Sequence, residues 1–578
     1  MSFEHRPSPS RVTEAAAAKL PRWIMFAVLA AYVVPGFFGR DPWSLDDMSA
    51  FGVMWTMANG SAVDWWLPSL AGEPVFDKGP LPFWVGALLI RIFGPLLGDI
   101  TAARLSMLFW FALGSSALWY ATYRLARRDE AQPVALAFGG QATPRAYGRM
   151  LADVAVFLLV ATFGVLVRIH ETGAETALLA LSAVLLFALA ISLDDPIKGT
   201  FAAGVTIGAI ALTRGWLPAG VLLAASIAFI ASTGEQRGWR AVVIAALALL
   251  IFSAWPLGAD AVVPTQAAPY LAAWWAANLS AIHWPSSENL LWIARNLGWF
   301  TWPLWPFALW TLYSWRHGLH RPHVLLPILL SFVGVISALL SSTPADRDLM
   351  VGVPAMVVLA TFGASSMKRS AEDAIDWFSM ALFTLALLGA WFYFAAWSSG
   401  FPPKMAASVA RLAPGVSVNT SVVAVTIAVL ASLAWLSIAV WRIRLRPRVL
   451  WRGPFLAASG LALVWTVALM LFQEPIEVNR SYAPIAASLS AQLKRVGGEG
   501  CVQPLTLPPG TRAMLAYHGH VRFERPEDAG LCRVLLQRDS KRNTLDDAPP
   551  AGQWELAYEL TRRARYDEVF RIWVRHTP

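Results

Sequence analysis

Two pairs of charged residues in the first hundred positions have the types and spacing to do chemistry. Asp46 and Asp47 follow an apolar segment in DPWSLDDMSAF, and Asp77 and Lys78 stand in VFDKGPLPFW. A carboxylate can take the proton of an attacking hydroxyl group, and a lysine can bind phosphate. Both pairs also have a structural interpretation. Ser44 with Asp47 three residues later fits a capped helix start, and Asp-Lys-Gly-Pro fits a tight turn.

Further isolated charges gather at the ends of apolar segments that we expect on one membrane face. They are Arg104, Arg168, His170, Glu171, Glu175, Arg214, His283, Glu288, Asp346, Arg347 and Asp348. The apolar segments are almost free of ionisable residues away from their ends, whereas ion-coupled transporters need such residues near the midplane. The pattern favours a site at the membrane interface, which a lipid headgroup enters while its tail stays in the bilayer. Taken alone, His170 and His283 are more typical of interfacial histidines than of ligands.

The composition is that of a polytopic membrane protein. Of 578 residues, 57% are hydrophobic and 14% are charged, and the mean hydropathy is +0.51. Soluble proteins have roughly 45 to 50% apolar and about 25% charged residues. A disordered chain and a water-soluble enzyme are therefore excluded as descriptions of the whole chain. The 29 tryptophans fit side chains that settle at membrane interfaces.

Thirteen segments are candidates for crossing the membrane, which takes about 20 mostly apolar residues for roughly 30 Å of hydrocarbon. They are 22–40, 103–123, 150–167, 176–193, 200–213, 216–232, 241–257, 296–315, 324–341, 349–366, 375–397, 418–441 and 453–472. Lys and Arg cluster in alternate connections, beginning with the N-terminal arm at 1–21, and such connections face the cytoplasm. We therefore expect a transmembrane domain at 22–472, with the N-terminus inside and the C-terminus outside. The first span reads as a retained signal anchor because no cleavage pattern follows it.

The segment 41–102 is expected to form one large loop outside the membrane. Its apolar stretch at 81–98 contains Arg91, and a charge at the bilayer centre costs roughly 2.5 to 3.5 kcal/mol. We therefore expect this stretch to be a helix lying in the interface, with Arg91 reaching the headgroups. Residues 48–57 are a second candidate for such an in-plane helix.

After residue 472 the composition changes to that of a small soluble domain, 473–578. Its first helix places Ile485, Leu489 and Leu493 on one face. Strands are predicted at 513–517, 534–537 and 569–574, so we expect an α/β domain outside the membrane. The two cysteines, Cys501 and Cys532, are predicted to form a disulfide in that oxidising compartment.

Taken together, these features resemble the lipid-dependent glycosyltransferases of the GT-C fold, in particular the group of 4-amino-4-deoxy-L-arabinose transferase and the protein O-mannosyltransferases. The acidic pair Asp46-Asp47 stands where that group usually has Asp-Glu. The stretch DWWLPSLAGEPVFDKGPLPFW at 64–84 carries Asp77-Lys78 in place of Glu-Lys. AARLSML at 102–108 and ALTRGWLPAGVLL at 211–223 match two further segments, the second with arginine in place of lysine.

The resemblance covers roughly the first 230 residues and has departures. The arabinose transferases usually carry an Arg-Tyr pair shortly after the acidic pair, where this chain has Ser49 and Ala50. Their later loop with lysine and tyrosine is here 341–354, in which Arg347 is the available cation. Both departures concern the donor phosphate or the sugar.

The resemblance implies a reaction and roles for residues. It implies inverting transfer of a sugar from a polyprenyl (undecaprenyl) phosphate to lipid A, a glycan or a protein, at the periplasmic face of a bacterial inner membrane. Asp46 is implied as the base or acceptor-orienting residue, with Asp47 as the near alternative. The cations implied for the donor phosphate are Lys78, Arg347 and Arg104, and the further site candidates are Arg168, Glu175 and Arg214. By analogy, Asp77 and His283 are conceivable ligands of a divalent cation.

Two other functions stay open on the sequence alone. A lipid or polysaccharide transporter without glycosyl transfer explains the hydrophobicity, but it leaves the ordered first loop without a purpose. A structural subunit of an envelope complex predicts a large exposed apolar patch on the outer domain. We expect the membrane and lipid-linked substrates as partners, and no nucleic acid.

Overall fold

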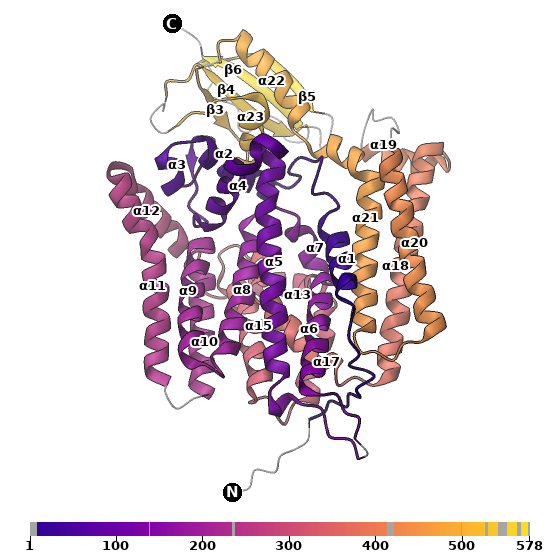
Figure 1. Ribbon diagram of the computed structural model, residues 1–578. Coiled ribbons are helices and arrows are strands. Elements are labelled where there is room, and N and C mark those ends of the chain that lie inside the picture. The colour runs from indigo at the N-terminus through magenta and orange to yellow at the C-terminus, as the bar shows by residue number, and fades with distance from the viewer. Residues whose placement is uncertain are drawn as a thin grey trace.

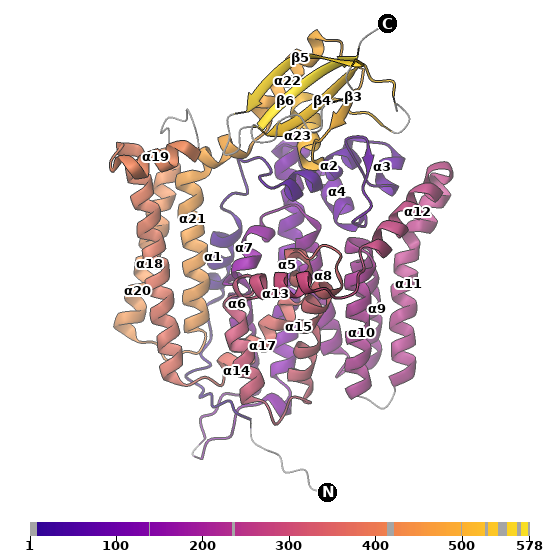
Figure 2. The same cartoon turned by 180° about the vertical axis from the view of Figure 1, so that it is seen from behind.

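The chain forms a layer of long helices with a small sheet-containing domain at one end. The structure is a computed structural model and describes residues 8–137, 139–233, 237–412, 421–498, 500–525, 530–540, 549, 552–562 and 568–575. Figures 1 and 2 show the long helices side by side, the C-terminal domain beyond one end of them and the N-terminal arm at the other end. We call these ends the domain face and the opposite face.

The described helices up to residue 233 differ widely in length. They are α1 Arg22–Val33, α2 Leu45–Asn59, α3 Ala62–Trp66, α4 Leu81–Leu97, α5 Asp99–Ala126, η1 Asp129–Ala131 (a short 3₁₀ helix), α6 Pro144–Val160, α7 Phe163–Ile169, α8 Ala174–Ile191, α9 Pro196–Arg214 and α10 Trp216–Thr233. A two-stranded hairpin, β1 Ser69–Leu70 and β2 Glu73–Pro74, lies between α3 and α4.

The later helices complete the bundle and enter the C-terminal domain. They are α11 Arg237–Val262, α12 Pro264–Ser280, α13 Ser287–Phe300, α14 Leu304–Ser314, α15 Pro322–Leu340, α16 Asp346–Met350, α17 Val353–Ala364, α18 Arg369–Ser399, α19 Pro403–Leu412, α20 Val422–Leu445, α21 Arg452–Arg480, α22 Ala483–Arg495 and α23 Pro509–Gly519. The predicted domain boundary at 472/473 falls within α21.

Nine described helices are long and apolar enough to cross a membrane. They are α5, α8, α9, α10, α11, α15, α18, α20 and the helix that begins at Arg452. The pair α6 and α7, bent by 74° between them, adds a tenth if it counts as one span. The predicted mainly helical membrane architecture is confirmed, whereas the count of thirteen spans is not.

Besides 150–167, which is divided into α6 and α7, three predicted spans do not form one long helix, namely 22–40, 296–315 and 349–366. The first is helical only as far as Val33. The second is divided into α13 and α14 at Pro303, and the third gives the 12-residue α17, with Pro354 in its first turn. Proline lacks the N–H group that continues a helix and is tolerated at the start of one. An apolar segment that contains proline can therefore be long enough to span the membrane without forming one long helix.

The first loop lies between the long helices and the C-terminal domain. Figure 1 shows α2, α3 and α4 at the domain face, beneath the sheet. Helix α4, predicted as an in-plane helix, has 17 residues and packs on α2 and α5. Arg91 on α4, expected to reach the headgroups, has partners within the protein. Its Nε atom donates to the carbonyl of Ala58 at 2.8 Å, and its guanidinium lies 5.0 Å from the centre of the Trp65 ring.

The C-terminal domain is a four-stranded sheet with two helices. The strands β3 Val502–Leu505, β4 Val534–Ser540, β5 Trp554–Arg562 and β6 Glu568–Arg575 lie in the order β3-β4-β6-β5. β3 and β4 are parallel, and the other pairs are antiparallel. The predicted strand at 513–517 is wrong, because these residues lie in α23. A short apolar run does not distinguish strand from helix, and Pro509 in the first turn favours the helix.

Helix α23 docks the C-terminal domain onto α2. Met48, Phe51 and Met54 of α2 share one buried cluster with Met514 and Leu515 of α23. Two glycines allow the close approach. A Cβ atom at position 52 would lie 2.5 Å from the Cβ of Ala513, and one at position 510 would lie 2.5 Å from the carbonyl oxygen of Leu45.

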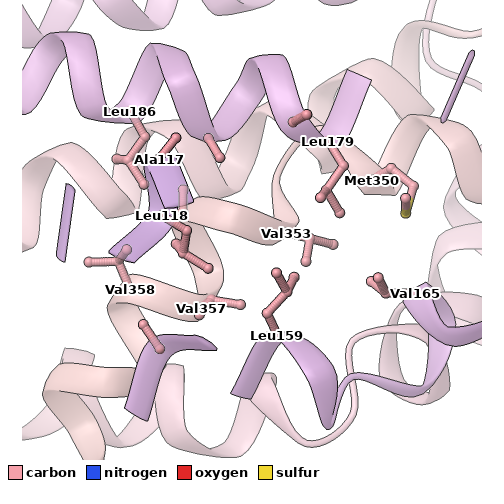
Figure 3. Close-up of a cluster of buried hydrophobic side chains, with 14 of the residues drawn as sticks. Ala117, Leu118, Leu159, Val165, Leu179, Leu186, Met350, Val353, Val357 and Val358 are labelled. Carbon is pink, nitrogen blue, oxygen red and sulfur yellow. The ribbon is translucent and has the colours of Figure 1, made fainter. Parts of the chain in front are cut away.

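The core of the membrane bundle is where α5, α6, α8 and α17 meet. Figure 3 shows the side chains of this region, including Leu118 of α5, Leu159 of α6, Leu179 of α8 and Val357 of α17. Val165 of α7 and Met350 of α16 extend the same cluster toward the domain face. The core therefore fixes α7, α8 and α16, three elements that carry charged residues at that face.

The disulfide between Cys501 and Cys532 closes a loop around β3 and α23, with Cα atoms 5.2 Å apart. Such a cross-link removes conformational freedom from the unfolded chain. Replacing both cysteines by serine should lower the stability of the C-terminal domain by about 3 to 4 kcal/mol. Limited proteolysis of the purified chain should then cut after residue 480 at lower temperature than in wild type. Equal cutting in the two proteins, with the disulfide intact in wild type, would contradict this.

Candidate functional site

The acidic pair lies in the first turn of α2, and its two carboxylates differ in surroundings. The hydroxyl of Ser44 accepts a hydrogen bond from the backbone N–H of Asp47 at 3.1 Å, so the predicted helix cap exists. The Asp47 side chain is buried, whereas 57% of the Asp46 side chain is exposed. The cap holds the backbone and leaves both carboxylates for other partners.

Asp47 ties α2 to the turn between α7 and α8. Its Oδ1 atom accepts hydrogen bonds from the backbone N–H and from the hydroxyl of Thr172, both at 2.8 Å. Its Oδ2 atom lies 3.8 Å from Nη1 of Arg40 and has no hydrogen-bond partner. The structure thus gives Asp47 an anchoring position inside the protein and leaves Asp46 as the accessible carboxylate.

Arg168, in the last turn of α7, gathers three carboxylates from different parts of the chain. Its Nη1 atom lies 3.2 Å from Oδ2 of Asp46 and 2.9 Å from Oε2 of Glu171, and its Nη2 atom lies 3.3 Å from Oδ2 of Asp346. The break between α6 and α7 turns α7 to the place where this is possible. Helices α2, α7 and α16 therefore meet at one cation.

A second cluster surrounds Asp77 and Lys78. The Oδ2 atom of Asp77 lies 3.9 Å from Nζ of Lys78 and 3.5 Å from Nη1 of Arg214. Only 10% of the Lys78 side chain and 9% of the Arg214 side chain are exposed. The buried Nη1 atom of Arg214 has no hydrogen-bond partner. The cationic nitrogens of this cluster can bind a further anion.

Backbone hydrogen bonds hold the loop that carries Lys78. The carbonyl of Lys78 accepts a hydrogen bond from Nε1 of Trp274 at 3.0 Å, and the N–H of Gly79 donates to the carbonyl of Thr213 at 3.2 Å. A Cβ atom at position 79 would lie 2.0 Å from the carbonyl oxygen of Leu212. Glycine is thus required for the loop to reach the end of α9, where Arg214 stands.

Helix α16 and the start of α8 connect the two clusters. Burial alone would raise the pKa of the Asp77 carboxyl, but the charges of Lys78, Arg214 and Arg347 hold that pKa below its usual range. Arg347 follows Asp346 directly and donates from Nη2 to the carbonyl and hydroxyl oxygens of Thr343, both at 3.3 Å. Burial and the charge of Arg214 lower the pKa of Arg347.

Glu175 is buried in the first turn of α8, where the charges of Arg214, Lys78 and Arg168 act on it. It therefore lies between the cluster of Arg168 and the cluster of Asp77. The predicted site residues Asp46, Asp77, Lys78, Arg168, Glu175, Arg214 and Arg347 form one charged region at the domain face.

Arg104 is near this region but has other partners. It is 1% exposed, and its Nη1 atom donates to the carbonyls of Phe37 at 3.2 Å and of Arg40 at 2.8 Å. It makes no ion pair within 4 Å with a described acidic residue. The structure places Arg104 beneath the loop between α1 and α2, so binding of donor phosphate by Arg104 stays a prediction.

The two predicted metal ligands do not make a metal site in the described part of the chain. His283 is exposed in the loop after α12, where its backbone N–H donates to the carbonyl of Leu340 at 2.7 Å. Among the described residues, no three His, Cys, Asp or Glu side chains are grouped so as to hold a metal ion. The divalent cation therefore stays a prediction.

The sequence analysis did not identify Arg40 and Thr172, which hold Asp47. Arg40 had a signal, because an arginine directly after the first span stands on the face where the positive-inside rule expects few. Thr172 had none. His170, which was noted, is buried, and its ring nitrogens bind the carbonyls of Leu166 and Tyr32 at 2.6 and 2.8 Å. It is a structural histidine.

Comparison with solved structures identifies the architecture. Two crystal structures of ArnT from Cupriavidus metallidurans each match 95% of this chain and 97% of theirs at 16% identity. The TM-score is 0.65 for the structure bound to undecaprenyl phosphate and 0.64 for the apo structure. The chain has the fold of ArnT.

The resemblance to the GT-C group is therefore confirmed at the level of the fold, over far more of the chain than the quoted motifs cover. The oligosaccharyltransferase of Archaeoglobus fulgidus matches 88% of this chain and 64% of its own at 11% identity, with a TM-score of 0.44, too low to support an argument. No protein-family model and no curated protein matches the chain.

The buried Glu171 beside Arg168 provides a test of the site's electrostatics. Burial, and next the negative charge of Asp47, raise the pKa of Glu171 from 4.5 to about 7, although Arg168 opposes this. A carboxyl whose pKa is raised on folding binds its proton more tightly in the folded state. Its ionisation therefore reduces stability as pH rises from 4.5 through about 7.

Glu171→Gln should consequently raise the temperature of thermal unfolding relative to wild type at pH 8, by more than at pH 5. Glutamine keeps an oxygen that can accept from Arg168, so the comparison isolates the charge. Glu14→Gln, at an exposed position of the N-terminal arm, is the matched control. A difference between Glu171→Gln and wild type that is the same at both pH values would disprove the assignment.

Proposed function

We propose that this protein is a glycosyltransferase that moves a sugar from a polyprenyl phosphate to an acceptor at the domain face. The observation that carries the proposal is the pairing of two features in one charged region. One is a cluster of buried cations in which Nη1 of Arg214 has no hydrogen-bond partner, and the other is the exposed carboxylate of Asp46. The fold shared with ArnT, solved with undecaprenyl phosphate bound, supports a polyprenyl phosphate as the donor.

Lys78 and Arg214 are proposed to bind the donor phosphate, with Arg347 adding positive charge. Their side chains are little exposed, and charge-assisted hydrogen bonds to phosphate are strong where water is scarce. Fixed cations stabilise the negative charge that develops on a departing phosphate. A phosphate leaving group needs little protonation, so this side of the reaction needs no general acid.

Asp46 is proposed to act on the acceptor. In the proposed step, the acceptor hydroxyl oxygen forms a bond to the anomeric carbon while the bond from that carbon to the phosphate oxygen breaks. The hydroxyl proton goes to the Asp46 carboxylate, and polyprenyl phosphate leaves. Attack opposite the leaving group inverts the anomeric centre. Arg168, 3.2 Å from Asp46, positions this carboxylate.

The proposed setting is a bacterial inner membrane, with the domain face on the periplasmic side and the N-terminal arm in the cytoplasm. The donor enters with its tail in the bilayer. Lipid A, an envelope glycan and a protein are the acceptor classes that the resemblance suggests. The lipid-transporter alternative assigns no chemistry to the same charged region.

The reaction is tested by incubating the purified chain in lipid nanodiscs with a panel of polyprenyl-phosphate sugars and envelope acceptors. Release of polyprenyl phosphate together with a glycosylated acceptor is the expected result. In closed proteoliposomes, movement of the lipid-linked sugar across the bilayer with every donor intact would favour the transporter instead.

Asp46→Asn should reduce the rate of transfer by about a hundredfold or more, because removing a general base typically costs that much. Donor affinity should change little, since Asp46 is not in the phosphate cluster. Asp260→Asn, at an exposed position of α11, should keep wild-type activity. Full transfer by Asp46→Asn would remove the proposed base.

Lys78→Ala should weaken the binding of undecaprenyl phosphate by about ten- to a hundredfold, the usual effect of losing a hydrogen bond to a charged group. Titration of the purified protein with this lipid measures the change. The control is Lys404→Ala, at an exposed position of α19. Equal affinity of Lys78→Ala and the control would exclude Lys78 as a phosphate ligand.

A further inference from the structure

A second charged cavity lies at the opposite face, remote from the proposed active site. It has a volume of about 380 Å³ and is enclosed by the ends of α18, α20 and α21. Figure 1 shows these ends away from the C-terminal domain. The proposed glycosyl transfer assigns nothing to this cavity.

The inner wall of this cavity is built from paired charges. Arg442 lies 2.6 Å from both Asp373 and Asp376, and Arg452 lies 3.1 Å from Asp373 and 2.6 Å from Asp376. Only 8% of the Arg442 side chain and 10% of the Arg452 side chain are exposed. Two arginines and two aspartates make this wall fixed and close to neutral.

The rim of the cavity is cationic. Arg369, Arg446 and Arg448 line it and make no ion pair within 4 Å with a described acidic residue, and Glu372 is the acidic residue beside them. Three positive charges against one negative charge leave a net attraction for an anion. The cavity is thus suited to an anionic group seated on a neutral wall.

An apolar groove lies beside this cavity, along the same helices α18 and α21. It has a volume of about 300 Å³ and is lined by residues of α6, α7, α14, α18 and α21. Among them, Trp302 and Phe378 bring their ring centres to 6.0 Å. A small cavity of about 20 Å³ lies between the two spaces, because its lining includes Glu372 and Arg452 of the charged cavity together with Phe307 of the groove.

We infer that these neighbouring spaces together bind an anionic phospholipid, with its phosphate at the arginine rim and an acyl chain in the apolar groove. A free phosphate would use only the charged cavity and would leave the groove without an occupant. A zwitterionic lipid has no net charge for the rim. Basic pockets between membrane helices recognise anionic headgroups on this principle. Bound there, the lipid fills the space between α18, α21 and the helices α6 and α14.

The test compares lipids and variants by native mass spectrometry of the purified full chain. Phosphatidylglycerol should remain bound at least about tenfold better than phosphatidylcholine with the same acyl chains, since each basic residue adds attraction for an anionic lipid. Arg369→Gln with Arg448→Gln should remove this preference. Lys368→Gln with Arg444→Gln removes the same charge from neighbouring positions that do not line the cavity, and it should keep the preference.

A third variant tests the groove. Ala457→Phe narrows it without changing any charge, and it should reduce binding of phosphatidylglycerol while leaving binding of glycerol phosphate unchanged. Equal binding of the two phospholipids to wild type would overturn the inference. So would an equal loss in the two double variants, or glycerol phosphate binding as tightly as phosphatidylglycerol.

Discussion

The buried carboxylate of Asp47 is the interaction on which the position of α2 depends. An unpaired charge in a protein interior is strongly unfavourable, so this carboxylate must find donors. The N–H and hydroxyl of Thr172 supply two of them, from the turn between α7 and α8. Because the first turn of α2 is thereby fixed against the bundle, the next side chain back, Asp46, is directed to Arg168. One carboxylate is used to place the other.

Other charged residues at the domain face also act as anchors between segments of the chain. Arg40 and Arg104 donate to carbonyls of the loop between α1 and α2 and shape it. Asp41 in this loop binds Ser481 and, at 3.0 Å, Nε2 of His518 on α23. The C-terminal domain is therefore attached both by this polar contact and by the apolar packing of α23 on α2. Its role in the structure is to hold the first loop, from which Asp46 and Lys78 come.

The features of the fold that depend on local sequence patterns could be predicted from the sequence. Long apolar segments give helices wherever proline does not interrupt them, and Ser44 with the acidic pair does begin α2. The charge-bearing loops were also found, because a charge beside an apolar span has few structural explanations. Predictions failed where the structure depends on residues that are distant in the sequence, or on a single break in a helix. Thr172 is an ordinary threonine until Asp47, 125 positions earlier, is folded against it. The apolar run at 513–517 is too short to distinguish strand from helix by itself, and the helix that forms there packs on α2.

The placement of Asp77 suggests how the proposed phosphate site avoids holding its product too tightly. Two buried cations facing one phosphate in a poorly hydrated site would bind substrate and product alike. Asp77 lies within 4 Å of both Lys78 and Arg214, and its lowered pKa keeps it ionised at neutral pH. Its negative charge offsets part of the attraction for any phosphate, including the departing one. With 65% of its side chain exposed, the Asp77 carboxylate is not fixed in place by packing. The cations beside it are thus partly neutralised before any phosphate binds, and the net attraction of the cluster for a phosphate is smaller than two lone cations would give.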